Sequence, residues 1–151
     1  MKVADILATK GSTVVTIKPT DTIGALCERL REKRIGAAVV SSDGQAVEGM
    51  ISERDVAYGL AVHKGALPTL QVSALMTKRV ITCSSSDSVS SVAGTMMAHT
   101  IRHIPVQDDG RLVGMVSIRD VLNVRVDDLQ RQTSQLRAFA YHVERNPPED
   151  R

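Results

Sequence analysis

The chain has 151 residues, of which 42% are hydrophobic and 24% charged, a balance typical of a globular protein. Its formal net charge of +2 is too small to indicate a nucleic-acid or membrane partner by itself. The aromatic residues are only Tyr58, Phe139 and Tyr141, so stacked aromatic platforms for single-stranded nucleic acid are excluded and the core must be aliphatic.

The two cysteines, Cys27 and Cys83, have neither the spacing of a metal site nor that of a redox pair. Both fall within apolar patterns, so we expect buried free thiols. Neither the first eleven residues nor any later run has the apolar length of a signal peptide or a membrane span. These features predict a cytoplasmic protein without a membrane partner.

The first elements in chain order are a lead-in strand and a helix. The strand is expected near Val14. Apolar residues then recur at i, i+3, i+4 and i+7 between Ile23 and Leu30, which predicts a helix that Thr20-Asp21 opens as a cap.

A hairpin and a second helix follow. A β-rich run over 35–40, a Ser-Asp-Gly turn over 42–44 and a second apolar run over 46–51 predict two antiparallel strands. The second strand ends at Ser52, and Asp55 three residues later is typical of a helix N-terminus.

The second half of the chain repeats this order. Residues 14–44 realign with residues 66 positions later, and beyond the turn the offset becomes 65. The second copy therefore predicts a lead-in strand near Val80, a helix after Ser86-Asp87 and strands over 101–106 and 111–116. Two copies are too few for a solenoid, so we expect a closed pair related by a pseudo-twofold axis.

Three stretches carry a family resemblance: Gly49-Met-Ile-Ser-Glu-Arg-Asp55, Gly114-Met-Val-Ser-Ile-Arg-Asp120 and Ile101-Arg-His-Ile-Pro-Val106. With this element order, the chain from about Val3 to Val124 resembles a pair of cystathionine-β-synthase-type (CBS) domains, or Bateman module. The resemblance implies an α+β fold in which two β-α-β-β-α repeats pack sheet to sheet, followed by a long C-terminal helix. The expected boundaries are repeat 1 over 1–64, a connector over 65–71, repeat 2 over 72–124, a dimerisation helix over 125–145 and a disordered tail over 146–151.

The Ser-x-Arg-Asp sequence that follows each second strand suits a nucleotide. At the start of a helix the Asp can accept hydrogen bonds from both ribose hydroxyls, while the Ser and the free N–H groups meet phosphate. The arginine between them is a planar cation that matches phosphate oxygens. The alternative is plain helix capping, which uses the same spacing. Duplication of the motif within the repeat favours the nucleotide.

In similar modules a nucleotide lies between the repeats, with its base against the strand of one copy and its ribose on the Ser-x-x-Asp of the other. Carried over, the resemblance implies a first site made by Ser12, Val14, Ile35, Gly36, Ala37, Ser117, Arg119 and Asp120. It implies a second site made by Lys78, Val80, Ile101, Arg102, His103, Ser52, Arg54 and Asp55. Because Arg102-His103 stand where the first copy has Gly36-Ala37, we expect the two sites to be unequal.

The function that the resemblance implies is a regulatory sensor of adenine nucleotides. AMP is the first expectation, with ATP or ADP as alternatives and NAD or NADH also compatible. The four histidines are scattered and none stands with a nucleophile or a metal-ligand set, so we expect neither an enzyme nor a metal protein. The alternative is a ligand-free interaction module with the same fold. In either case the effector protein is unknown, and a nucleic-acid partner is not expected.

The C-terminal segment predicts one long helix to about Arg145. Leucine or valine recurs every seven residues from Leu122 to Val143, with Val126, Thr133 and Ala140 between them, as in a coiled-coil seam. We expect a homodimer whose C-terminal helices pack together, with Phe139 and Tyr141 contributing. The alternative is a helix that lies on its own domain.

Overall fold

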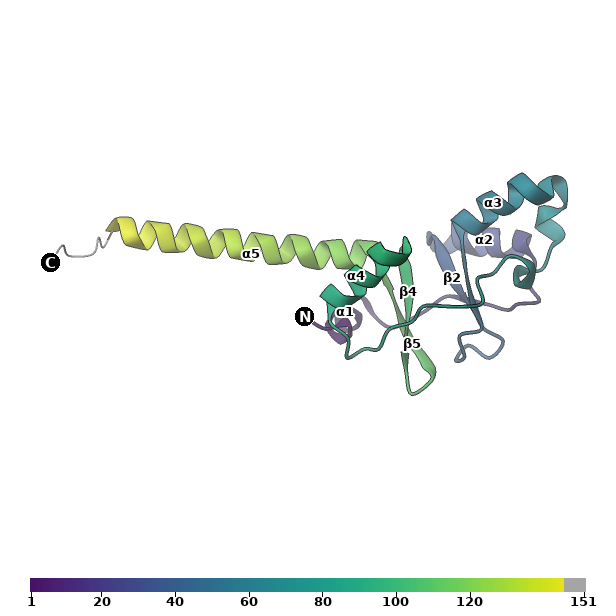
Figure 1. Ribbon diagram of the computed structural model, residues 1–151, viewed down its shortest axis with the longest axis horizontal. Helices are drawn as coiled ribbons and strands as arrows, with labels where there is room; N and C mark the ends of the chain where they lie inside the picture. Colours follow the sequence, from purple (N-terminus) through teal and green to yellow (C-terminus); the bar gives the residue numbers. More distant parts are fainter. Residues whose placement is uncertain (146–151) are drawn as a thin grey trace. The chain divides into compact units, whose positions relative to one another are not determined.

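The computed structural model describes residues 1–145 and divides the chain into two units, residues 1–117 and the segment that begins at Ile118 (Figure 1). The first unit contains α1 (Val3–Lys10), β1 (Thr16–Ile17), α2 (Ile23–Lys33), β2 (Ala37–Val40), β3 (Gly49–Ser52), α3 (Glu53–His63), the 3₁₀ helices η1 (Lys64–Thr69) and η2 (Val72–Ala74), α4 (Val89–His99), β4 (His103–Asp108) and β5 (Arg111–Ser117). The second unit is helix α5 (Ile118–Arg145). The predicted disordered tail, 146–151, lies outside the described residues.

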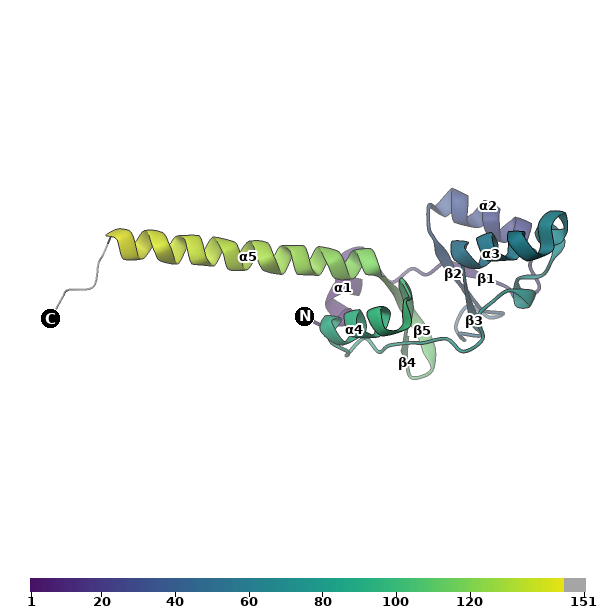
Figure 2. The same cartoon turned by 45° about the horizontal axis from the view of Figure 1, so that its top comes forward.

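The first half of unit one is a three-stranded sheet with two helices packed on it. The strand order is β1-β2-β3, with β1 parallel and β3 antiparallel to β2. Figure 2 shows α2 and α3 together beside this sheet. Ile23, Leu26 and Leu30 on α2 pack with Val40 and Ile51 of the sheet in one aliphatic cluster. The helical spacing predicted these inward-facing residues correctly.

The second half has the same plan with a smaller sheet. Strands β4 and β5 pair antiparallel, and the residues buried on them are Ile104, Pro105, Val106, Gly114 and Val116. Helix α4 contributes Val89, Val92 and Met96 to the buried set. The core is therefore aliphatic in both halves, as the composition predicts.

The predicted repeat is visible in the backbone hydrogen bonds. Ile17 pairs parallel with Val40, and Cys83 makes the equivalent single bridge with Val106, 66 positions later. The predicted lead-in strand near Val14 thus begins at Thr16, and the one near Val80 is reduced to this bridge.

The predicted start of both repeat helices was two residues too early. Thr22 and Ser88 are the N-caps, and each hydroxyl accepts a hydrogen bond from the backbone N–H three residues on. Asp21, which was expected to help open the first helix, instead accepts a hydrogen bond from the Lys18 N–H at 3.0 Å and closes the preceding turn. Asp87 accepts one from the Ser84 N–H in the same way.

The two hairpins differ in their connections. In the second, only Asp109 and Gly110 separate the strands, with φ of 50° and 74°, the left-handed pair that a tight hairpin requires. In the first, the strand expected over 46–51 begins only at Gly49. Asp43 accepts hydrogen bonds from the N–H groups of Gln45 and Ala46, both at 2.8 Å. These two N–H groups therefore bond to a side chain and not to β2.

The segment that precedes each half in the sequence packs on the other half. Helix α1 lies on the second half, where the N–H groups of Val3 and Ala4 donate to the carbonyls of Asp87 and Ser85, each at 2.9 Å. Around η2, Val72 is buried in the cluster of the first half. The expected boundaries follow the sequence repeat, whereas these two segments are exchanged in packing.

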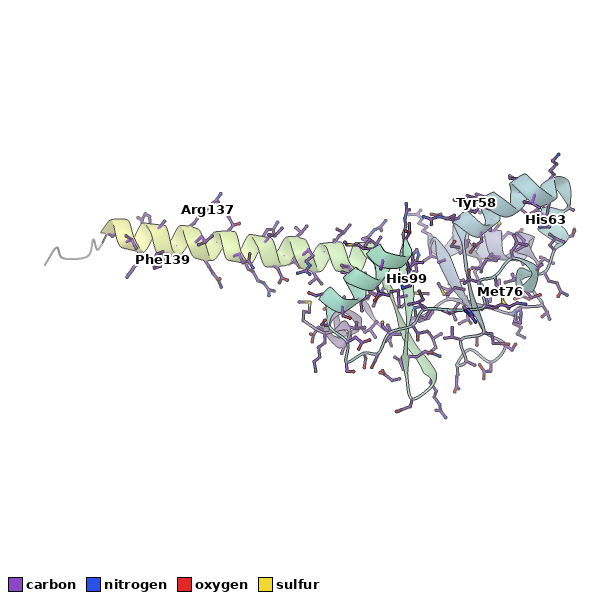
Figure 3. All side chains as sticks on the ribbon, viewed as in Figure 1. Tyr58, His63, Met76, His99, Arg137 and Phe139 are labelled. Carbon is purple, nitrogen blue, oxygen red and sulfur yellow. The ribbon has the colours of Figure 1, made fainter. Side chains whose placement is uncertain are left out.

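Two equivalent glycines make room for the exchanged segments. A Cβ on Gly114 would lie 2.6 Å from a Leu7 methyl group, and one on Gly49 would lie 2.7 Å from the Met76 sulfur and 3.0 Å from the Thr77 carbonyl oxygen. Met76 is labelled in Figure 3. The glycine that opens each of the two Gly-Met stretches, Gly49 and Gly114, is therefore needed for close packing.

We predict that Gly49→Ala lowers the free energy of unfolding by about 1–3 kcal/mol, because the added methyl group overpacks against backbone that cannot rotate away. The matched control is Gly94→Ala in the middle of α4, where nothing lies within 4 Å of the added Cβ. That control should instead gain up to about 1 kcal/mol from helix propensity. Denaturant titration of both variants measures the difference, and equal effects would contradict the close-packing explanation.

Helix α5 is a single helix from Ile118 to Arg145, which confirms the predicted long C-terminal helix. Its seam residues Leu122, Val126, Leu129 and Leu136 are all at least half exposed. Figure 3 shows Arg137 and Phe139 pointing to opposite sides of this helix. Within residues 1–145, neither α5 nor any other helix combines the length and apolar content needed to cross a bilayer.

Candidate functional site

A cavity of about 420 Å³ lies in unit one, between the start of α3 and the segments that flank α4. This volume is within the range of small-molecule sites, roughly 300–1,000 Å³. Both halves of the repeat contribute to its walls. The lining residues are Gly36, Ala37, Met50, Ser52, Glu53, Arg54, Asp55, Thr77, Arg79, Val80, Ile81, His99, Thr100, Ile101, Arg102 and His103.

Ser52 and Asp55 meet at the N-terminus of α3, where β3 ends against the cavity. The Asp55 Oδ2 atom accepts hydrogen bonds from the Ser52 N–H at 2.8 Å and from the Ser52 hydroxyl at 3.1 Å. The Ser52 hydroxyl oxygen in turn accepts the Asp55 N–H at 3.4 Å. The pair thus caps the helix as the alternative interpretation predicts. Among the described residues none hydrogen-bonds to Oδ1, so capping leaves that oxygen available.

Arg54 links the two halves beside the cavity. Its Nη1 atom donates a hydrogen bond to the Thr100 carbonyl oxygen at 3.3 Å, where Thr100 ends α4 in the left-handed conformation at φ 53°. This bond uses one of the five N–H donors of the guanidinium group. The cation is therefore held at the cavity with donors to spare.

The structure brings together seven of the eight residues expected for the second site. Ser52, Arg54 and Asp55 come from the first half, and Val80, Ile101, Arg102 and His103 come from the second. Lys78, the eighth, is exposed and does not line the cavity.

Several lining residues were missed by the sequence reasoning. The resemblance implied Lys78 together with Val80, but residues 78–82 form no regular strand, and Arg79, Val80 and Ile81 all reach the cavity. His99, labelled in Figure 3, was missed because it is the last residue of α4 and no motif marks it. Arg79 and Ile81, which flank the correctly predicted Val80, had no detectable signal beyond the basic pair Lys78-Arg79.

The eight residues expected for the first site are not gathered in one cavity of unit one. Gly36 and Ala37 line the cavity just described, while Ile35 lines a smaller hollow with Cys27 and Val56. Arg119 and Asp120 belong to α5, the second unit. Their pairing with Ser12, Val14, Ile35, Gly36, Ala37 and Ser117 stays a prediction.

The cysteines differ from the expectation of two buried thiols. Cys27 is exposed on α2, so that expectation was wrong for it: as the i+4 member of the apolar stripe it lies at the edge of the buried face. Cys83 is half-buried. Burial raises the pKa of the Cys83 thiol to about 11, and the negative charges of Asp87 and Asp108 contribute to the rise.

We predict that one thiol reacts quickly with Ellman's reagent at pH 8 and that the other reacts slowly. Because the thiolate is the reactive form, a pKa near 11 leaves only about one part in a thousand of Cys83 reactive at that pH. Cys27→Ser should remove the fast phase, and the slow phase should accelerate as the pH approaches 11. Two equally fast thiols in the native protein would contradict this assignment.

Among residues 1–145, no group of three or more His, Cys, Asp or Glu side chains is placed to hold a metal ion. The polar groups around the cavity are instead guanidinium, carboxylate, hydroxyl and imidazole groups beside the aliphatic side chains of Val80, Ile81 and Ile101. A flat apolar group with a polar or anionic extension fits these walls.

Comparison with known proteins identifies the family. The model of the CBS domain matches residues 3–61 and 72–127, so the chain belongs to the CBS domain family and carries two copies. The crystal structure of the CBS-domain containing protein ATU1752 from Agrobacterium tumefaciens is similar, with 38% sequence identity and a TM-score of 0.79. The match covers 82% of this chain and 92% of that one. The predicted tandem α+β fold is confirmed.

Two similar structures contain adenosine compounds. The CBS domain protein PAE2072 from Pyrobaculum aerophilum was solved with AMP; it is 29% identical over 80% of this chain and 89% of that one, with a TM-score of 0.70. The CBS domain pair of protein MJ0100 was solved with 5′-methylthioadenosine and S-adenosyl-L-methionine; it is 27% identical over 85% of this chain and 98% of that one, with a TM-score of 0.75. Both of these CBS domain proteins therefore bind adenosine derivatives.

Proposed function

We propose that this chain is a regulatory module that binds an adenine nucleotide, AMP in the first place, in the cavity beside α3. The observation that carries the proposal is the convergence of Ser52, Arg54 and Asp55 from one half with Ile101 and neighbouring residues from the other. A ligand there touches both halves, so it can favour one conformation over another by its differential affinity. The role is regulatory rather than catalytic.

The walls of the cavity suit the parts of a nucleotide. Val80, Ile81 and Ile101 offer an apolar surface for the base. The free Oδ1 of Asp55 is an acceptor for ribose hydroxyls, and Arg54 has donors left for phosphate. ADP, ATP, NAD and NADH share the adenosine half, so they belong in the same titration. A cytoplasmic location and an effector protein stay predictions.

We predict that AMP raises the midpoint of thermal unfolding of the wild-type protein and that Asp55→Ala weakens AMP binding at least about ten-fold, because hydrogen bonds to a charged group contribute about 1.5–3 kcal/mol. Calorimetry measures both. Asp120→Ala is the equivalent test of the first predicted site.

Asp55→Ala also removes a helix cap, which costs about 1 kcal/mol of stability. Ser88→Ala removes the cap of α4 outside the cavity and is the matched control. It should lose similar stability and keep wild-type affinity for AMP. No stabilisation by any adenine compound would reject the proposal in favour of a ligand-free interaction module.

We also propose that the module is a homodimer in which α5 pairs with α5 of a second copy. The seam that begins with Leu122, Val126 and Leu129 has the seven-residue period of a coiled coil and is exposed along the helix. Phe139, which is 70% exposed, borders this seam. The α5 helix of a second copy has a seam of the same period and length, so it is the partner that fits this seam.

We predict that Leu129→Glu converts the dimer to a monomer in sedimentation velocity at micromolar concentration, because a buried charge is placed in the seam. Gln135→Glu, on the opposite face of α5, adds the same charge outside the seam and should leave the dimer intact. A wild-type protein that sediments as a monomer would reject the dimer proposal.

A further inference from the structure

The cavity contains more cationic than anionic side chains. Arg54, Arg79 and Arg102 line it, against the carboxylates of Glu53 and Asp55. The side chains of all three arginines are exposed. The cavity thus presents three permanent positive charges to any molecule that fills it.

The two carboxylates do not neutralise these arginines. Asp55 is hydrogen-bonded to Ser52 at the helix cap. Glu53 lies over the backbone of Gly36, where an added Cβ would be 3.3 Å from its Oε1 atom. In the part of the chain that the structure describes, neither Arg79 nor Arg102 has a carboxylate within ion-pair distance. The start of α3 adds the partial positive charge of a helix N-terminus to the same wall.

The repeat shows that the fold does not require these charges. The residues 66 positions before Arg79 and Arg102 are Thr13 and Gly36, both uncharged. The backbone around the two copies is nevertheless equivalent, as the bridges Ile17–Val40 and Cys83–Val106 show. The positive charge is therefore a property of one copy, and a structural role does not account for it.

Resting on the proposed function, we infer that this cavity selects adenosine compounds by their phosphate charge. Arg79 and Arg102, with Arg54, favour AMP and its di- and triphosphates over uncharged adenosine derivatives. They disfavour S-adenosyl compounds that carry a sulfonium cation, because like charges repel each other. Arg79 and Arg102 are thus specificity-determining residues.

The test is calorimetric titration of the full chain with AMP, adenosine and S-adenosylmethionine at one ionic strength. AMP should bind at least about ten-fold more tightly than adenosine, which is about 1.4 kcal/mol, and more tightly still than S-adenosylmethionine. The double variant Arg79→Ala with Arg102→Ala should lose at least ten-fold of the affinity for AMP and keep its affinity for adenosine. Raising the salt concentration should weaken AMP binding to the wild type and leave adenosine binding unchanged.

The matched control is Arg111→Ala, which removes an exposed arginine at the β4–β5 hairpin outside the cavity and should leave all three affinities unchanged. Equal binding of AMP and adenosine, or tighter binding of S-adenosylmethionine, would overturn the phosphate inference while the proposed function stands. The absence of binding by all three compounds would overturn the proposed function and this inference with it.

Discussion

The structure depends on a reciprocal exchange of two short segments. Helix α1 leads into the first half of the repeat but hydrogen-bonds to residues 85–87 of the second half, and the segment around η2 leads into the second half but packs in the first. A half of this size buries a smaller fraction of its surface than a larger domain does and would be only marginally stable alone. In the exchange, α1 packs on the second half and the segment around η2 packs on the first. Gly49 and Gly114 have no side chain, so these segments can lie directly on the strands. The cavity exists because the two halves are held together in this way.

Much of this arrangement could be predicted from the sequence, because it depends on local patterns that occur twice. The apolar spacing from Ile23 to Leu30 identified a buried helix face, and the duplicated Ser-x-Arg-Asp stretch singled out the start of α3, which lines the cavity. The repeat offset of 66 positions appears again in the backbone pairing of Ile17 and Cys83. Such features need no knowledge of distant contacts.

What the sequence reasoning missed depends on irregular backbone and tertiary packing. The resemblance implied Lys78 for the site, but residues 78–82 form no regular strand and Arg79 lines the cavity instead. The first hairpin was expected to be tight, but Asp43 binds two backbone N–H groups and delays the second strand to Gly49. Periodicity also placed Cys27 in the core, although it lies at the edge of the helix stripe and is exposed. In each case one side chain or one irregular segment outweighed a regular pattern.

The exchanged segments also determine how the halves can move. Since α1 belongs by packing to the second half and η2 to the first, the chain passes between the halves twice, near residues 11–15 and again near residues 77–80. Two connections between the halves restrict a hinge opening more than a single linker would. The second connection includes Thr77, Arg79 and Val80, which form part of the cavity wall. A molecule that fills the cavity would therefore contact one of the two connections between the halves directly.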